Sequence, residues 1–223
     1  MLGGNGPTVT LLAHHPELLG ALREPSANEP WRVLVSGCLA GWQCGVDGTG
    51  YGLGRGGEGL FTLPTIRVIP FCPEQHGMGT PRTMPDLHGG DGVDVLAGRA
   101  RVLDEHGVDL TGAMIRGARA MLAHARAERA ELAILTDASA ACGSQVISDG
   151  CRLVPVRKHQ KGVGVATALL LEAGIPVVAQ RDLRTMARLR ARLDPSYVVP
   201  EGLLDHHEHP WTLANLPGPH PRT

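Results

Sequence analysis

Three short apolar runs, each followed by a cysteine, constrain the fold of this chain more than any other feature. The runs are Arg32 to Val35, Ile66 to Phe71 and Leu132 to Leu135, and the cysteines that follow them are Cys38, Cys72 and Cys142. Short apolar runs of this kind predict buried strands. In an open α/β sheet, ligands bind in the crevice beyond the carboxyl ends of the strands. The three thiols are therefore expected to converge there, although they lie far apart in the sequence.

Helical patterns alternate with these runs. The clearest helix runs from Thr111 to Ala127, with Thr111 as its cap and apolar residues on one face. A second helix is expected from Val163 to Ala173, then a fourth strand from Ile175 to Ala179 and an arginine-rich helix from Asp182 to Leu193. Such alternation predicts an α/β fold, a Rossmann-like single domain with a mainly parallel sheet and helices on both faces.

The length of the chain sets its domain organisation. With 223 residues and 43% hydrophobic content, it can bury one large core. We expect a peripheral extension over residues 1–30, with a short helix from Pro16 to Arg23, and the α/β domain over residues 31–180. Residues 181–223 are expected to form a helix and a tail that pack on the same domain or trail from it. The tail histidines, among them His206, could hold a transition metal, but a solvated tail is the favoured interpretation.

Charge and cysteine usage narrow the class of protein. The formal net charge of −1 argues against charge-driven binding to duplex nucleic acid. The five cysteines lack the dense spacing of a secreted disulfide scaffold, which favours a reducing cytoplasm. The first six residues carry no basic residue of a signal peptide, and no apolar stretch is long enough to cross a membrane. We expect a cytoplasmic protein with no membrane partner.

The three cysteines admit several kinds of chemistry. Three thiolates without a nearby fourth ligand suit an iron-sulfur cluster that leaves one iron open. Zinc is the rival metal, but structural zinc sites favour C-x-x-C pairs, and the nearest spacing here is Cys38 to Cys44. Two other interpretations stay open: ordinary buried thiols, or a nucleophilic Cys72 paired with His76.

Four segments make the chain resemble a known family. They are Ser36 to Gly41 with Asp47-Gly48 after it, Cys72-Pro73-Glu74 with Gly77 and Pro81-Arg82 after it, Asp109-Leu110-Thr111 before an alanine-rich helix, and Ser139 to Ser144 with Asp149-Gly150 and Gly162 to Thr167 downstream. In order and spacing the chain resembles the 2-thiouracil desulfidase family, small bacterial proteins that remove sulfur from thiolated pyrimidines with a [4Fe-4S] cluster held by three cysteines. The resemblance runs from about Arg32 to Gln180.

The resemblance implies an enzyme and a set of ligands. It implies that Cys38, Cys72 and Cys142 hold a [4Fe-4S] cluster and that Cys44 and Cys151 do not. The implied activity is that of a desulfidase, a hydrolase acting on a carbon-sulfur bond, and the implied substrate is a small thiolated heterocycle such as 2-thiouracil.

The chain departs from the family pattern near the predicted site. Gly45 and Val46 stand where the family usually has Arg-Tyr, Thr136 stands where it has lysine, and Ala140 replaces a proline. Because proline fixes φ, the loop around Ala140 is expected to differ in shape. These departures favour a family member with a different thiolated substrate.

Residues near the cysteines suggest a mechanism. The thiocarbonyl sulfur is expected to bind the open iron, which draws electron density from the adjacent carbon so that water attacks it. Glu74 is the first candidate for the base and Asp47 the second, although each could instead cap a helix or turn. Ser139 is expected to hydrogen-bond the heterocycle or relay a proton. Arg82 is expected to orient the substrate or to pair with Asp86.

Two alternative functions remain at this point. The first is dethiolation of 4-thiouridine, as a nucleoside or within RNA, with phosphate contacts from Arg152 to Lys161 and Arg181 to Arg192. The second is a non-catalytic iron-sulfur or zinc protein that senses redox state or stabilises a partner. No sequence feature predicts the oligomeric state.

Overall fold

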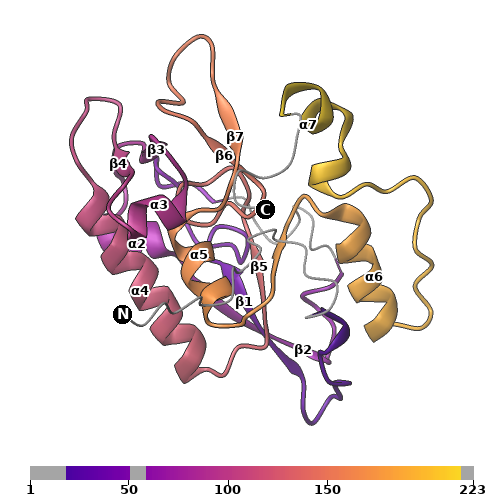
Figure 1. Ribbon diagram of the computed structural model, residues 1–223. Helices are drawn as coiled ribbons and strands as arrows, with labels where there is room; N and C mark the ends of the chain where they lie inside the picture. The colour runs from indigo at the N-terminus through magenta and orange to yellow at the C-terminus, as the bar shows by residue number, and fades with distance from the viewer. Residues whose placement is uncertain (1–18, 51–58, 217–223) are drawn as a thin grey trace, which may run out of the picture.

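The computed structural model describes residues 19–50 and 59–216 of the chain (Figure 1). In chain order its elements are β1 (Trp31–Ser36), β2 (Ile66–Phe71), α2 (Pro73–Met78), β3 (Asp86–His88), α3 (Gly92–Leu96), β4 (Arg101–Leu103), α4 (Thr111–Ala127), β5 (Leu132–Leu135), β6 (Val146–Ser148), β7 (His159–Lys161), α5 (Val165–Glu172), β8 (Val177–Ala179), α6 (Leu183–Leu193), the 3-10 helix η1 (His206–Glu208) and α7 (Pro210–Asn215).

The central sheet is parallel, as predicted, and its order places the site. Its four strands lie in the order β2-β1-β5-β8. From β1 the chain passes to β2 on one side and then crosses to β5 and β8 on the other. The carboxyl ends of β1 and β5 therefore border a topological switch point, where ligands bind in open α/β sheets.

Alternating side chains give the sheet two buried faces. Leu34 of β1 and Ala133 of β5 pack with α4 and α5 in one hydrophobic cluster. Their neighbours Val33 and Ile134 point the opposite way and pack with Met186 of α6 in another. Figure 1 shows α4 and α5 on one side of the strands and α6 on the other. The prediction of helices on both faces is confirmed.

A close contact between helices fixes α2, which begins directly after Cys72. Gly77 of α2 faces Gly117 of α4, and a Cβ atom at Gly117 would lie 1.9 Å from the carbonyl oxygen of Pro73. A Cβ at Gly77 would lie 2.2 Å from the carbonyl oxygen of Ala113. Only glycine allows two backbones to approach so closely, so the position of α2 depends on this pair.

The structure confirms the bounds predicted for α4 but not its cap. The residue before the helix is Leu110, and Thr111 instead forms a hydrogen bond with β4: its Oγ1 accepts from the amide of Val102 at 3.0 Å. The amide of Thr111 donates to Asp109 Oδ1 at 2.9 Å, a bond within the turn that precedes the helix. The N-cap residue itself, Leu110, makes no side-chain cap hydrogen bond.

Two antiparallel hairpins were missed from the sequence. The pair β3-β4 and the pair β6-β7 each form a two-stranded sheet, and β6-β7 lies between Cys142 and the second predicted helix, where no strand was predicted. Strand β7 consists of His159, Gln160 and Lys161 and lacks the apolar alternation that predicts a strand. Of the helix predicted from Pro16 to Arg23, residues 16–18 lie outside the described residues, and helical structure ends at Gly20.

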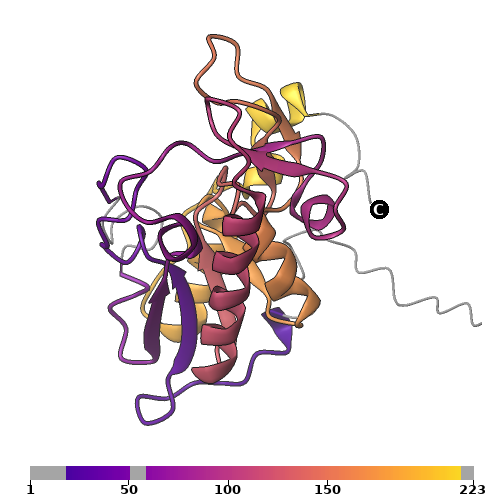
Figure 2. The ribbon, with the colours of Figure 1, turned by 90° about the vertical axis from the view of Figure 1, so that its left-hand side faces the viewer.

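The segments flanking the α/β core pack against it. Leu19 and Leu22 contact the cluster that includes α6, and Arg192 of α6 donates to the carbonyl of Leu19 at 3.1 Å. At the other end, η1 and α7 lie beside the β6-β7 hairpin in both views (Figure 2), where the rings of His159 and Trp211 are 5.3 Å apart. No helix in the described ranges has the length and apolar character needed to cross a membrane.

Candidate active site

The three predicted cysteines meet in one cavity at the switch point. Cys38 follows β1, Cys72 precedes α2 after β2, and Cys142 lies in the loop after β5. They line a cavity of about 130 Å³, which we call the cysteine cavity. Its other lining residues are Ser36, Gly37, Cys44, Gly45, Val46, Phe71, Pro73, Glu74, Arg82, Met84, Thr136, Asp137, Ala138, Ser139 and Arg152. The expected convergence at the strand ends is thus present.

Hydrogen bonds hold the first two thiols at the cavity wall. Cys38 Sγ lies 3.0 Å from Thr136 Oγ1, which links the ends of β1 and β5. Cys72 is the N-cap of α2, and its Sγ accepts from the amide of Gln75 at 3.4 Å.

Cys142 is fixed mainly through its backbone. Its amide donates to Ser139 Oγ at 3.0 Å, and its carbonyl accepts from Thr167 Oγ1 of α5 at 2.9 Å. Burial raises the pKa of the Cys142 thiol well above its ordinary value. Coordination of a metal ion would offset this effect of burial, because a coordinating thiol is deprotonated.

A fourth thiol, Cys44, which the sequence resemblance excludes as a ligand, interacts with the first two. Cys44 is buried, and its hydrogen bond lowers the pKa of Cys38 to about 7 despite the burial of Cys38. The Cys44 thiol also lowers the pKa of Cys72, while its own pKa rises far above the ordinary value because of its hydrogen bonding with these two thiols and its burial. Two of the three predicted ligands are thus biased towards the thiolate, the form that binds metals.

The donor set fits an iron-sulfur cluster. Within the ranges described, no three His, Cys, Asp or Glu side chains gather closely enough to hold a single metal ion. The three thiols instead surround a cavity from three separate loops, and all five cysteines are unpaired. A cluster with one cysteine per iron accommodates ligands spread in this way. The proposed partner of Cys72, His76, is not among the lining residues, and its ring lies 5.5 Å from that of Phe71.

Glu74 and Ser139 are brought together in the cavity wall. Ser139 Oγ donates to Glu74 Oε1 at 2.9 Å, and Arg82 Nη2 donates to Glu74 Oε2 at 2.6 Å. The side chains of Arg82 and Glu74 are 5% and 12% exposed, so this ion pair is shielded from water. The predicted surface pairing of Arg82 with Asp86 was wrong, because Asp86 pairs with Arg152.

Asp47 does not join this group. It is exposed and does not line the cysteine cavity. Its Oδ1 accepts from the hydroxyl of Thr49 at 2.7 Å and from the Thr49 amide at 3.0 Å, and these bonds lower the pKa of Asp47. The structure places this carboxylate in a turn.

Three of the four departures from the family pattern fall on the cavity wall, and the fourth, Ala140, is buried in the core. Gly45, Val46 and Thr136 all line the cavity. The guanidinium of Arg82 donates to the carbonyls of Cys44 at 3.0 Å and Gly45 at 3.4 Å. Arg82 thus supplies a positive charge beside the position where the family usually carries an arginine.

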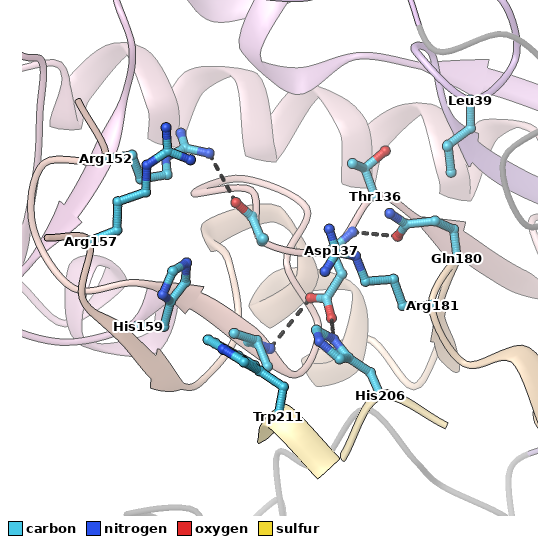
Figure 3. Close-up of a pocket in the computed structure, with 12 residues that line it drawn as sticks. Leu39, Thr136, Asp137, Arg152, Arg157, His159, Gln180, Arg181, His206 and Trp211 are labelled. Carbon is cyan, nitrogen blue, oxygen red and sulfur yellow. Dashed lines mark hydrogen bonds and ion pairs between the residues drawn. The ribbon is translucent and has the colours of Figure 1, made fainter. Parts of the chain in front are cut away.

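A second, larger cavity adjoins the first (Figure 3). It has a volume of about 400 Å³ and shares Thr136, Asp137, Ala138 and Arg152 with the cysteine cavity. We call it the basic cavity. Its remaining lining residues are Leu39, Val146, Arg157, His159, Gln180, Arg181, His206 and Trp211. Burial and the charges of Arg152, Arg157 and Arg181 lower the pKa of His159, which reflects a positive potential.

The C-terminal histidines do not form a solvated tail as a whole. His206 is buried and its Nδ1 hydrogen-bonds Asp137 Oδ2. His209 is exposed and accepts from the amide of Trp211 at 3.2 Å. The prediction of a solvated tail is therefore wrong for His206, because a buried carboxylate needs a hydrogen-bond donor and this histidine supplies it.

Comparison with known proteins identifies the family. The family model for 2-thiouracil desulfurase matches residues 33–182. A protein of Bacillus subtilis (strain 168) named YbbK, itself uncharacterized, is 35% identical over 153 residues, which cover 68% of this chain and 97% of that relative. The solved structure of the [4Fe-4S]-dependent thiouracil desulfidase TudS matches with a TM-score of 0.56 and 31% identity, over 72% of this chain and 98% of that one. The chain belongs to the 2-thiouracil desulfurase family.

Proposed function

We propose that this protein is a [4Fe-4S]-dependent desulfidase that removes sulfur from a small thiolated heterocycle such as 2-thiouracil. The observation that carries the proposal is the convergence of Cys38, Cys72 and Cys142 on a cavity that also contains Glu74. The similarity to TudS supports the same cofactor and the same class of substrate. Free thiols throughout the described chain suit a cytoplasmic location.

Cys38, Cys72 and Cys142 would hold the cluster. When bound by three thiolates, a [4Fe-4S] cluster supplies one iron with an open coordination position, a Lewis acid for the thiocarbonyl sulfur. Other residues of the cysteine cavity would then act on the neighbouring carbon. The overall reaction is a hydrolysis, in which water supplies the carbonyl oxygen and sulfur leaves as hydrogen sulfide.

Glu74 is the proposed general base. Its carboxylate is held from one side by Arg82 and from the other by Ser139, so its orientation is fixed within the cavity. It would remove a proton from the attacking water as the oxygen bonds to carbon. The same group can return that proton to the departing sulfur, which balances the reaction without a reductant or an oxidant.

Ser139 connects the base with a cluster ligand. Its hydroxyl donates to Glu74 while its oxygen accepts from the amides of Ala141 and Cys142. We propose that Ser139 relays a proton between Glu74 and the heterocycle. Its hydrogen bonds to the loop would also fix the position of Glu74 relative to Cys142. Asp47, the second candidate base, stays outside the cysteine cavity.

The first test is anaerobic reconstitution with iron and sulfide. Wild type is expected to bind about four irons per chain, and its absorption spectrum should shift when 2-thiouracil is added. Cys142→Ser should lose the cluster. If wild type bound no iron, the proposed cofactor would be wrong. If the absorption spectrum of the cluster did not change with 2-thiouracil, the non-catalytic alternative would be favoured.

The second test separates the base from the cofactor. Glu74→Gln should retain the iron content and spectrum of wild type while turnover falls by at least about a hundredfold. Asp47→Asn is the matched control and should keep its activity. Full activity in Glu74→Gln would remove Glu74 from the role of base.

The basic cavity favours a second candidate substrate, a 4-thiouridine that carries phosphate. The side chains of Arg157 and Arg181 line this cavity and form no hydrogen bond or ion pair with any described residue. Of the other arginines invoked from the sequence, Arg152 pairs with Asp86, Arg184 with Glu208 and Arg192 with Glu24. Two unpaired guanidinium groups beside the reaction cavity suit a phosphate.

A comparison of substrates tests this candidate. Arg181→Ala should lower kcat/KM for 4-thiouridine 5′-monophosphate by about tenfold or more and leave that for 2-thiouracil within about twofold. Salt-sensitive binding of 4-thiouridine-containing RNA would extend the site to RNA. Equal losses on both substrates would contradict a phosphate site.

A further inference from the structure

We propose that residues 183–216, which follow the segment shared with the family, are a positioning element of the active site. In this proposal His206 holds Asp137, and Asp137 holds the loop that carries Ser139 and Cys142. The role in catalysis rests on the proposed function, but the role in ordering the loop does not. His206 is thus a positioning residue that touches neither the cluster ligands nor the base.

Asp137 organises the loop from within. Its carboxylate is fully buried, and Oδ1 accepts from three successive amides: Ser144 at 2.9 Å, Gln145 at 3.3 Å and Val146 at 3.4 Å. The residues between Asp137 and these amides include both Ser139 and Cys142. One carboxylate therefore closes the loop in which a cluster ligand lies.

His206 supplies the fourth hydrogen bond to that carboxylate, from Nδ1 to Oδ2 (Figure 3). Burial raises the pKa of Asp137, but the bond and charge of His206 and the bonds from Ser144 and Gln145 outweigh it, so the pKa lies below its ordinary value. Asp137 is therefore an acceptor only, which places a proton on His206 Nδ1. Without this donor, one oxygen of a buried carboxylate would have no partner in its site.

The position of His206 is itself over-determined. Its amide donates at 3.1 Å to Asp182 Oδ1, which also accepts from the side chain of Gln145. The preceding Asp205 accepts from the amide and the hydroxyl of Thr185 in α6, at 2.8 and 2.9 Å. The 3-10 turn that carries His206 is thus tied both to α6 and to the loop.

Backbone strain next to Asp137 shows why the loop needs outside support. Ala138 has a φ of +58°, in the left-handed region that L residues other than glycine rarely occupy. Its amide donates to the carbonyl of Val146 at 3.0 Å, so this conformation closes the loop. Such conformations persist when surrounding contacts over-determine them, and the Asp137-His206 pair is such a contact.

The test compares two substitutions of His206. His206→Ala removes the donor, whereas His206→Asn places an amide N–H close to the position of Nδ1. In the apo proteins, hydrogen exchange at the amides of Ser144, Gln145 and Val146 should be about tenfold faster or more in the alanine variant. The asparagine variant should restore protection to within about threefold of wild type.

A matched control isolates the positioning effect. Glu208→Gln alters the same 3-10 turn and its ion pair with Arg184 but leaves His206 and Asp137 untouched, so its exchange should match wild type. In reconstituted protein, His206→Ala should lower kcat with little change in KM and should lose its cluster faster in air, and the asparagine variant should rescue both.

Two outcomes would overturn the proposal: wild-type protection of these amides in a folded His206→Ala, or equal losses in the alanine and asparagine variants. If wild type bound no cluster, the proposed function would fail, yet the exchange experiment would still decide the role of His206. If His206→Ala did not fold, the asparagine variant and the Glu208→Gln control would carry the same test.

Discussion

The two neighbouring cavities are lined by different kinds of side chain. The cysteine cavity is small, lies at the carboxyl ends of β1, β2 and β5, and is lined by thiols with one shielded ion pair. The basic cavity is about three times larger and is lined by arginines, histidines and a tryptophan, two of its residues coming from beyond the family segment. The difference indicates that sheet topology places the cysteine cavity, while residues that follow the family segment complete the wall of the basic cavity.

The largest expected effect tests which thiols define the cysteine cavity. Cys72→Ala should abolish cluster binding, whereas Cys44→Ala should retain most of the iron, because three ligands suffice and Cys44 acts only by hydrogen bonds to its neighbours. Iron content after anaerobic reconstitution measures both. Loss of the cluster in Cys44→Ala would make Cys44 a fourth ligand and would remove the open iron.

A smaller effect tests how the cavity is held by the fold. In Gly117→Ala the new Cβ would clash with the carbonyl of Pro73, which should destabilise the apo protein by about 1–3 kcal/mol. Gly112→Ala, in the same helix, meets only Arg116 Nη1 at 3.7 Å and should stabilise by up to about 1 kcal/mol. Urea unfolding of the two variants measures both changes in the free energy of unfolding. Equal effects would mean that the contact between α2 and α4 does not matter.

The wall shared by the two cavities should show an acid-dependent stability. The pKa of Asp137 is lowered on folding, so its contribution is present above the unfolded pKa and is lost as pH falls through the folded value. At pH 7 wild type should be more stable than Asp137→Asn by about 1–3 kcal/mol. This gap should narrow below about pH 4. The measurement is urea unfolding against pH.

A control variant gives that result its meaning. Asp47→Asn alters an exposed carboxyl whose pKa is also lowered, by its bonds to Thr49. Solvent screening should leave its gap from wild type close to zero at every pH. A gap for Asp137→Asn that did not vary with pH would contradict an ionised Asp137 in the folded protein.

The smallest effect concerns strain in the same wall. Ala138→Gly should relieve the left-handed conformation and change stability by about 1 kcal/mol or less. Arg129→Gly, at a φ of +53°, relieves comparable strain outside both cavities. Turnover should fall in Ala138→Gly and not in Arg129→Gly, since only the former loosens the loop of Cys142. Equal turnover in the two variants would mean that the backbone strain at Ala138 has no role in turnover.

The parts that sequence could predict are those with local signals. Each of Cys38, Cys72 and Cys142 follows its own strand, and parallel strands bring their carboxyl ends to one edge, so convergence followed from three local patterns. The bounds of α4 were also predictable from a local signal, the helical periodicity of its apolar residues.

The missed parts depend on pairings between distant residues. Nothing near Asp137 indicates His206, and nothing near Glu74 indicates that Arg82 pairs with it and not with Asp86. Strand β7 is polar because it pairs only with β6, outside the central sheet. Buried ion pairs and peripheral hairpins are determined by tertiary packing. Secondary-structure propensity and hydrophobic periodicity carry no information about such packing.

The switch point also makes the donor set depend on the fold. The pairing of β1 with β2 and with β5 is what brings the thiols of Cys38, Cys72 and Cys142 together. An unfolded chain therefore offers no preformed donor set. On the proposed function, cluster uptake is coupled to formation of the central sheet, and a folding defect far from the cysteines would lower the iron content of the protein.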